Sequence, residues 1–179
     1  MSSAFSPIDR FTARVARRLG EAEGRILEVV APGRGCGRHG ARFWSPRLEY
    51  ATLGFEFQAG LDFLPAHAHD WTDLPENHFD AALVEGLSDR LPSPGLVLQE
   101  IRRVLRPGGL VWVADRVDRG ADAPDAAHGQ DAPIGQQIIV EVPGMAVEEC
   151  GPLAADDVGG TPGWWYAVLS KPLGPMPTA

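Results

Sequence analysis

The sequence has few potential metal ligands or disulfide partners and no long apolar run. Its 179 residues include two cysteines, Cys36 and Cys150, too few for a framework of disulfide bonds. His67 and His69 lack further ligands at a fitting spacing, so we expect no metal site. No apolar stretch reaches the roughly 20 residues of a membrane-spanning helix, and the first residues, MSSAFSPIDRF, lack the apolar core of a secretory signal. We therefore expect a cytoplasmic protein without a membrane partner.

Positive charge is also scarce. The chain has 16 Lys and Arg against 24 Asp and Glu, a net charge of −8 at pH 7. Proteins that bind nucleic acid need a basic surface, so we expect no nucleic-acid partner. Four arginines do gather near the start, which is typical of one solvated helix face: Arg10, Arg14, Arg17 and Arg18. The hydrophobic content of 44% and charged content of 22% are ordinary for one globular domain.

What the sequence does contain is a strand–helix–strand unit within Asp70–Asp115. Two apolar runs, Phe79–Val84 and Leu110–Ala114, have the length and composition of buried strands. Between them, Leu96–Arg106 places its apolar residues on one face of a helix. The Pro-Gly-Gly sequence at 107–109 is expected to end this helix and turn the chain into the next strand. The unit predicts an α/β fold.

Further elements are predicted on both sides of this unit. They are a helix over Ser6–Leu19, strands at Arg25–Val30, Leu48–Phe57 and Leu61–Pro65, a short helix at Pro133–Val142, and strands at Ala146–Leu153 and Gly163–Lys171. We divide the chain into an N-terminal helix in residues 1–23, one domain over 24–172 and a disordered tail at 173–179. Residues 116–132 have the composition of a mobile loop, which is either a substrate lid or plain disorder.

The connection between the second and third strands is unusually short. Only Gln58–His69 separates Phe57 from Asp70, and this segment must also contain the third strand. A parallel crossover normally takes a dozen or more residues. We therefore predict that the crossover helix is reduced to a turn or missing. The thinly covered sheet that results is expected to be covered by a second copy in a homodimer, or by a protein partner.

The segment that begins Asp-Trp-Thr-Asp-Leu-Pro at Asp70 continues with Phe79-Asp80 and ends in Arg-Val-Leu-Arg-Pro-Gly-Gly at 103–109. This succession resembles class I S-adenosylmethionine-dependent methyltransferases, most closely the type 11 methyltransferase domain, and the resemblance covers about Gly24 to Pro172. It implies a Rossmann-like fold, a mostly parallel sheet with an antiparallel last strand. It also implies S-adenosylmethionine as the cofactor and a small molecule as the substrate.

The resemblance assigns Glu28 and the following loop, APGRGCGRHG, to the main cofactor motif of the family, an acid followed by alternating glycines. Here Val30 stands where the first glycine is expected and Pro32 stands near the second, while Gly33 and Gly35 belong to a displaced set of glycines. A valine at this position would intrude where the methionine part of the cofactor lies. Either the loop has shifted its register or the site is lost.

The resemblance also assigns cofactor contacts outside this loop. It gives Glu56 the role of the carboxylate that accepts both ribose hydroxyls, as charge-assisted hydrogen bonds would allow. It assigns Asp70 and Trp71 to the pocket for the adenine, on which an aromatic ring can stack. Glu85 follows the predicted strand at the mouth of the pocket, where the family often has a His or aromatic residue instead. We expect Glu85 to contact the cofactor, and it is a weak candidate for a general base. No catalytic dyad is evident.

The activity has alternative interpretations. Methyl transfer from a sulfonium depends on proximity and alignment more than on a base, which favours a methyltransferase acting on a small molecule. Val30, Pro32 and the missing crossover helix favour a catalytically inactive, methyltransferase-like protein that serves as a binding or assembly partner. A third interpretation keeps the cofactor site but uses it for ligand sensing.

Overall fold

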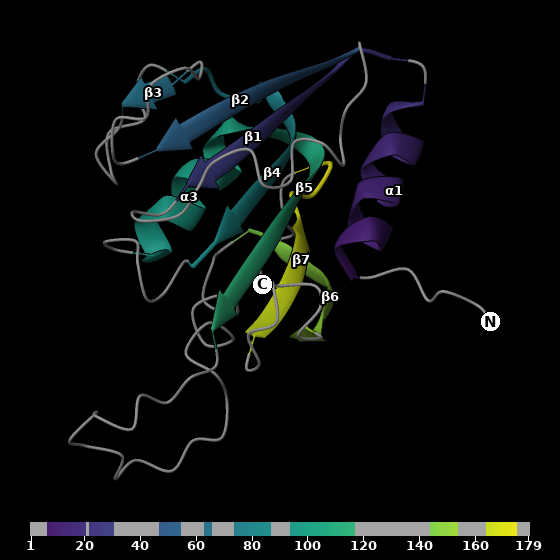
Figure 1. Cartoon of the computed structure of the whole chain (residues 1–179). Coiled ribbons are helices and arrows are strands. Elements are labelled where there is room, and N and C mark those ends of the chain that lie inside the picture. Colours follow the sequence, from purple (N-terminus) through teal and green to yellow (C-terminus); the bar gives the residue numbers. More distant parts are fainter. Residues whose placement is uncertain are drawn as a thin grey trace, which may run out of the picture.

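The structure is a computed structural model of the whole chain, and it describes residues 7–20, 22–30, 47–54, 63–65, 74–86, 94–116, 144–153 and 164–174. Its elements are α1 (Pro7–Leu19), β1 (Gly24–Val30), β2 (Leu48–Gly54), β3 (Phe63–Pro65), β4 (Phe79–Glu85), α3 (Pro94–Val104), β5 (Leu105–Arg116), β6 (Ala146–Leu153) and β7 (Trp164–Ser170). The strands form a seven-stranded sheet in the order β3-β2-β1-β4-β5-β7-β6, as Figure 1 shows.

The sheet is parallel from β3 to β5 and antiparallel where β7 lies between β5 and β6. The predicted α/β fold, mostly parallel with an antiparallel last strand, is therefore confirmed. The chain first winds from β1 through β2 to β3, and then returns to the other side of β1 with β4 and β5. Open α/β sheets bind their ligands at such a reversal, outside the carboxyl ends of the strands.

The short connection between β2 and β3 is present as predicted. β2 ends at Gly54 and β3 begins at Phe63, yet the two strands pair in parallel. Residues 55–62 alone join them, which is fewer than a usual parallel crossover requires. Both described strands lie within their predicted ranges, and the other predicted residues, among them Glu56 and Phe57, lie outside the described residues.

The core has two halves, one on each face of the sheet. On one face, the buried side chains of α3 pack on the odd-numbered residues of β5, such as Val111 and Val113. On the other face, α1 packs on Trp112, whose ring centroid lies 5.8 Å from that of Phe11. The leading helix therefore packs on the sheet (Figure 1). The alternation follows from the period of two along a strand.

The predicted turn at residues 107–109 is wrong in one respect. α3 ends at Val104 and β5 begins at once, so these residues lie within a strand. Phe79 pairs with Leu105 and Ala81 with Leu110, which makes an irregular bulge on β5. Gly108 has φ of 78°, a value that favours glycine. The Pro-Gly-Gly sequence therefore forms the bulge that realigns β5 with β4.

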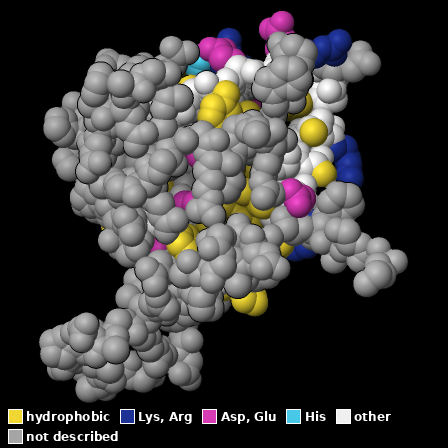
Figure 2. Space-filling view, viewed as in Figure 1, with side chains coloured by type: hydrophobic (Ala, Val, Ile, Leu, Met, Phe, Trp, Pro, Cys, Tyr) yellow, Lys and Arg dark blue, Asp and Glu magenta, His cyan; other side chains and the backbone are white. Residues whose placement is uncertain are grey.

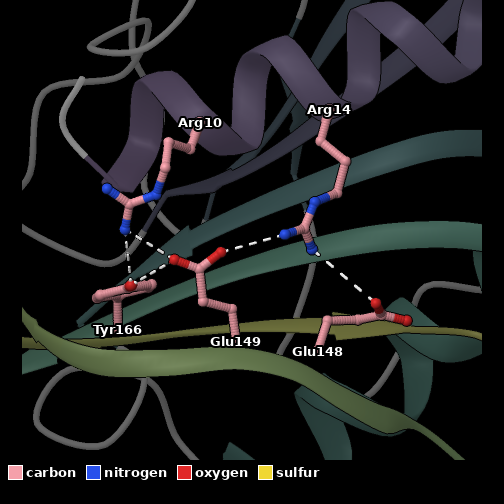
Figure 3. Close-up of polar contacts among 5 residues, drawn as sticks. All are labelled: Arg10, Arg14, Glu148, Glu149 and Tyr166. Carbon is pink, nitrogen blue, oxygen red and sulfur yellow. Dashed lines mark hydrogen bonds and ion pairs between the residues drawn. The ribbon is translucent and has the colours of Figure 1, made fainter. Parts of the chain in front are cut away.

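The basic face of α1 is not simply solvated, which corrects another expectation. Arg10 Nη2 lies 2.7 Å from Glu149 Oε1 on β6, and Arg14 Nη2 lies 3.1 Å from Glu149 Oε2. Arg14 also approaches Glu148 at 3.9 Å. The Tyr166 hydroxyl donates to Glu149 Oε1 at 2.7 Å, so the three elements α1, β6 and β7 meet at one carboxylate (Figure 3). In the space-filling view, Lys and Arg side chains gather along the side formed by α1 (Figure 2).

This cluster predicts a pH-dependent contribution of Glu149 to stability. The hydrogen bond from Arg10, together with the one from Tyr166, holds the pKa of the Glu149 carboxyl below its ordinary value of 4.5, although burial acts in the opposite direction. Because the pKa is lowered in the folded state, the ionised carboxylate stabilises the fold above that ordinary value. The contribution is lost as the pH falls through the pKa of the folded state.

We therefore expect Glu149→Gln to lower the free energy of unfolding by about 1 kcal/mol at neutral pH. Urea denaturation at neutral pH and at about pH 3 would measure the difference between variant and native protein at each value. The difference should shrink at the acidic pH. An equal difference at both values would contradict this role of the cluster.

Candidate functional site

One row of residues crosses the sheet at the carboxyl ends of the parallel strands. Gly54 at the end of β2 pairs with Val30 at the end of β1, and Val30 pairs on its other side with Glu85 at the end of β4. Glu85 pairs in turn with Ala114 near the end of β5. The row lies at the winding reversal around β1, so it marks the edge where this fold would hold a ligand.

Glu28 is a buried acid beside this row. It stands two residues before the end of β1, its Cα partners are Thr52 and Leu83, and only 5% of it is exposed. The Tyr50 hydroxyl of β2 donates a hydrogen bond to Glu28 Oε2 at 2.5 Å. A buried carboxylate is costly unless it is hydrogen-bonded or paired with a positive charge. The fold therefore maintains an acceptor at this edge.

Glu85 is a second acid on the same face of the sheet. Cross-strand partners share a face, and the partner Ala114 belongs to the half of the core beneath α1. Leu83, the partner of Glu28, belongs to the same half. Gly86 follows with φ of 73° and donates its backbone N–H to the carbonyl oxygen of Ala114 at 2.8 Å. Glu85 itself is half-buried.

Two further polar residues at this edge were not predicted. Thr52, beside Glu28 in the register, is 5% exposed, and Asp115 on β5 is 1% exposed. The cross-strand partner of Asp115 is Trp165, which belongs to the half of the core beneath α3. Asp115 therefore lies on the face of the sheet opposite to that of Glu28 and Glu85. An acid that directly follows the apolar run Leu110–Ala114 is a signal that could have identified Asp115. Thr52 carries no comparable signal, because threonine is common in strands.

The other predicted positions lie outside the described residues. They are Pro32, Gly33, Gly35, Glu56, Asp70 and Trp71 of the cofactor site, the pair His67 and His69, the loop from residue 117 onward, the short helix at Pro133–Val142, and the tail from residue 175. The structure thus brings Glu28 and Glu85 to one edge and places the backbone of Val30 between Gly54 and Glu85.

Two features are not found in the part of the chain that the structure describes. No three His, Cys, Asp or Glu side chains gather there as a metal site would require. No described helix has both the length and the apolar character needed to span a membrane. Cys150 on β6 is exposed and has a free thiol. The cytoplasmic location and the absence of a nucleic-acid partner stay predictions.

A cavity of about 560 Å³ lies at the opposite, amino-terminal edge of the sheet, next to the bulge in β5. Its charged side chains already bind other groups in the protein. Arg106 Nη1 lies 2.9 Å from Asp80 Oδ1, Arg18 donates to the carbonyl oxygen of Gly108, and Lys171 Nζ donates to the carbonyl oxygen of Leu105 at 2.7 Å. We therefore do not assign a cofactor to this cavity, and we locate the candidate site at the carboxyl edge.

Comparisons with known proteins find similarity to methyltransferases. Residues 18–113 match the family model described as a methyltransferase domain. A fatty-acid O-methyltransferase from Mycolicibacterium smegmatis is 34% identical over an alignment of 126 positions, which covers 62% of this chain and 43% of that protein. The chain therefore spans less than half the length of this curated relative.

Solved structures share the fold at lower identity. The [4+2]-cyclase SpnF superimposes with a TM-score of 0.63 and 21% identity, over 93% of this chain and 81% of that chain. The Burkholderia thailandensis 1,6-didemethyltoxoflavin-N1-methyltransferase, solved with S-adenosylhomocysteine, superimposes with a TM-score of 0.63 and 17% identity. The match covers 93% of this chain and 79% of that chain. A chain from the complex of the Haloferax volcanii Trm112 methyltransferase activator with a methyltransferase superimposes with a TM-score of 0.58 and 16% identity. The match covers 94% of this chain and 98% of that chain.

Proposed function

The chain belongs to the methyltransferase domain family, and from this premise we propose that it binds S-adenosylmethionine at the carboxyl edge and methylates a small molecule. The observation that carries the proposal is the buried Glu28 carboxylate, which lies beside the winding reversal on the same face as Glu85. S-adenosylmethionine carries an ammonium and a sulfonium group. A buried carboxylate fits such a cation, because opposite charges strengthen a hydrogen bond at a site shielded from water.

In this proposal Glu28 binds the ammonium group of the cofactor. When bound, the cofactor supplies an already activated methyl group, so the protein contributes mainly proximity and alignment. Glu85 lies beside Val30 in the register, close enough to the same edge to serve as a weak candidate for the base. The residues proposed to complete the cofactor site are Gly33 and Gly35 in the loop, Glu56 for the ribose, and Asp70 and Trp71 for the adenine.

The substrate class is proposed from the relative and from the chemistry of the edge. The Mycolicibacterium relative is named a fatty-acid O-methyltransferase, which points to an oxygen atom as the acceptor. A carboxylate is ionised at neutral pH and needs no base before it attacks a methyl group. An acidic small molecule is therefore compatible with a site in which Glu85 is a weak base candidate.

A second candidate function is a binding or assembly role without catalysis. Val30 takes the position of a glycine directly beside Glu85, and this observation favours the alternative. SpnF, which is named a [4+2]-cyclase, and the chain from the Trm112 complex have this fold, so the fold alone does not determine the reaction. In either case we propose that a second copy or a protein partner covers the sheet near β2 and β3. A monomeric mass measured by light scattering would contradict the proposed homodimer.

Titration with S-adenosylmethionine and S-adenosylhomocysteine distinguishes the two candidates. A ligand at 100 times its dissociation constant should stabilise the folded protein by ~2.7 kcal/mol. We expect a rise in melting temperature with either ligand, measured by thermal denaturation, and calorimetry would give the dissociation constants. No shift at millimolar concentrations would reject the cofactor site and favour the binding role.

A further inference from the structure

The hydrogen bond between Tyr50 and Glu28 joins β2 and β1 inside the candidate site. The register pairs Tyr50 with Ile26, so the Tyr50 side chain must reach along the strand direction to meet Glu28 Oε2. The two oxygen atoms lie 2.5 Å apart, so the tyrosine hydroxyl binds the carboxyl group directly. Tyr50 also packs against the half of the core beneath α1. Its hydroxyl therefore comes from a ring that the core holds in place.

We propose that Tyr50 is a positioning residue, which orients the Glu28 carboxylate to receive the ammonium group of the methyl donor. The inference rests on the proposed function. A glutamate side chain has several rotatable bonds, and fixing it before the ligand arrives reduces the entropy lost on binding. A tyrosine hydroxyl is neutral, so its hydrogen bond leaves the negative charge of Glu28 in place for the cation of the ligand.

A purely structural role would give Tyr50 the task of satisfying a buried carboxylate. The two roles differ in the ligand that they affect. S-adenosylhomocysteine has the ammonium group, whereas 5′-methylthioadenosine has the same adenosine and thioether but lacks the amino-acid part. A positioning role changes affinity for the first ligand alone, and general damage to the site changes affinity for both.

The test is Tyr50→Phe, with both ligands titrated by calorimetry. We expect S-adenosylhomocysteine to bind about tenfold more weakly, because the variant loses one hydrogen bond to a charged group. The affinity for 5′-methylthioadenosine should not change. The matched control is Tyr166→Phe, which removes the other tyrosine hydroxyl bound to a glutamate, at Glu149 instead of Glu28. It should leave both affinities unchanged.

A double-mutant cycle with Glu28→Gln completes the experiment. If Tyr50 acts through Glu28, Tyr50→Phe should add little to the loss in the Glu28→Gln background, so the two effects are not additive. Additive losses, or an equal loss for both ligands, would overturn the positioning role. Equal affinities of the native protein for both ligands would also overturn it while leaving the cofactor site intact. If the native protein binds neither ligand, the proposed function itself fails.

Discussion

Glu28→Gln should weaken the binding of S-adenosylhomocysteine by about 100-fold, close to 3 kcal/mol. The substitution keeps the size of the side chain and leaves an oxygen that can still accept from the Tyr50 hydroxyl. It removes the negative charge, and an ammonium group placed at this buried edge then has no ionised partner at that position. The loss should exceed that of Tyr50→Phe, because that variant retains the carboxylate. Calorimetric titration of native and variant protein measures both.

The matched control is Glu23→Gln. Glu23 comes just before β1 at the opposite edge of the sheet, and it is exposed. This variant makes the same change in net charge and should bind S-adenosylhomocysteine like the native protein. Urea denaturation would establish that Glu28→Gln is folded. Unchanged affinity in a folded Glu28→Gln variant would disprove the assignment of the ammonium group to Glu28.

Trp112→Ala is expected to cause the largest loss of stability, about 3–5 kcal/mol. Trp112 lies in the middle of β5 and is 1% exposed. Its ring stacks on Tyr166 with centroids 4.9 Å apart, and its centroid lies 5.8 Å from that of Phe11 of α1. Removing the ring would leave a cavity between the helix and two strands. The midpoint and slope of urea denaturation give the free energy of unfolding.

The control for this variant is Leu96→Ala on α3. Leu96 is 44% exposed, so the substitution should change the free energy of unfolding by no more than about 0.5 kcal/mol. A loss of less than about 1 kcal/mol in Trp112→Ala would mean that α1 and β7 close around the vacant space. That outcome would contradict a close-packed core between α1 and the sheet.

Most strands were predictable from the sequence because a buried strand is recognisable from the apolar residues of its own segment. The run at Phe79–Val84 is apolar enough to identify β4, which the structure extends by one residue to Glu85. Contacts between distant segments were not predictable in this way. The bulge at residues 107–109 depends on how β5 aligns with β4, and Arg10 binds Glu149, which is 139 residues away in the chain. A charge pattern on one helix cannot identify such a partner.

The candidate site was predictable to the same extent as the strands. Glu28 was identified through the resemblance to the cofactor motif of the family, and Glu85 because it follows a predicted strand. Parallel strands bring such ends together. Tyr50 was not singled out, since its role depends on reaching across to a neighbouring strand. The sequence analysis named Asp115 only as the last residue of the strand–helix–strand unit and did not predict its burial. The local pattern thus predicts the edge, whereas the polar contacts along it require the register of the sheet.

The position of β7 has a consequence for the order in which the chain assembles. β7 is the last strand in the sequence, yet it lies between β5 and β6 and contributes Tyr166 to the surface on which α1 packs. As a ribosome releases the chain from its amino terminus, α1 emerges long before that surface is complete. β1, β4 and β5 contribute to it earlier, but Tyr166 and Val168 join it only when translation reaches residues 164–170. The first helix therefore completes its packing only after β7 has been synthesised.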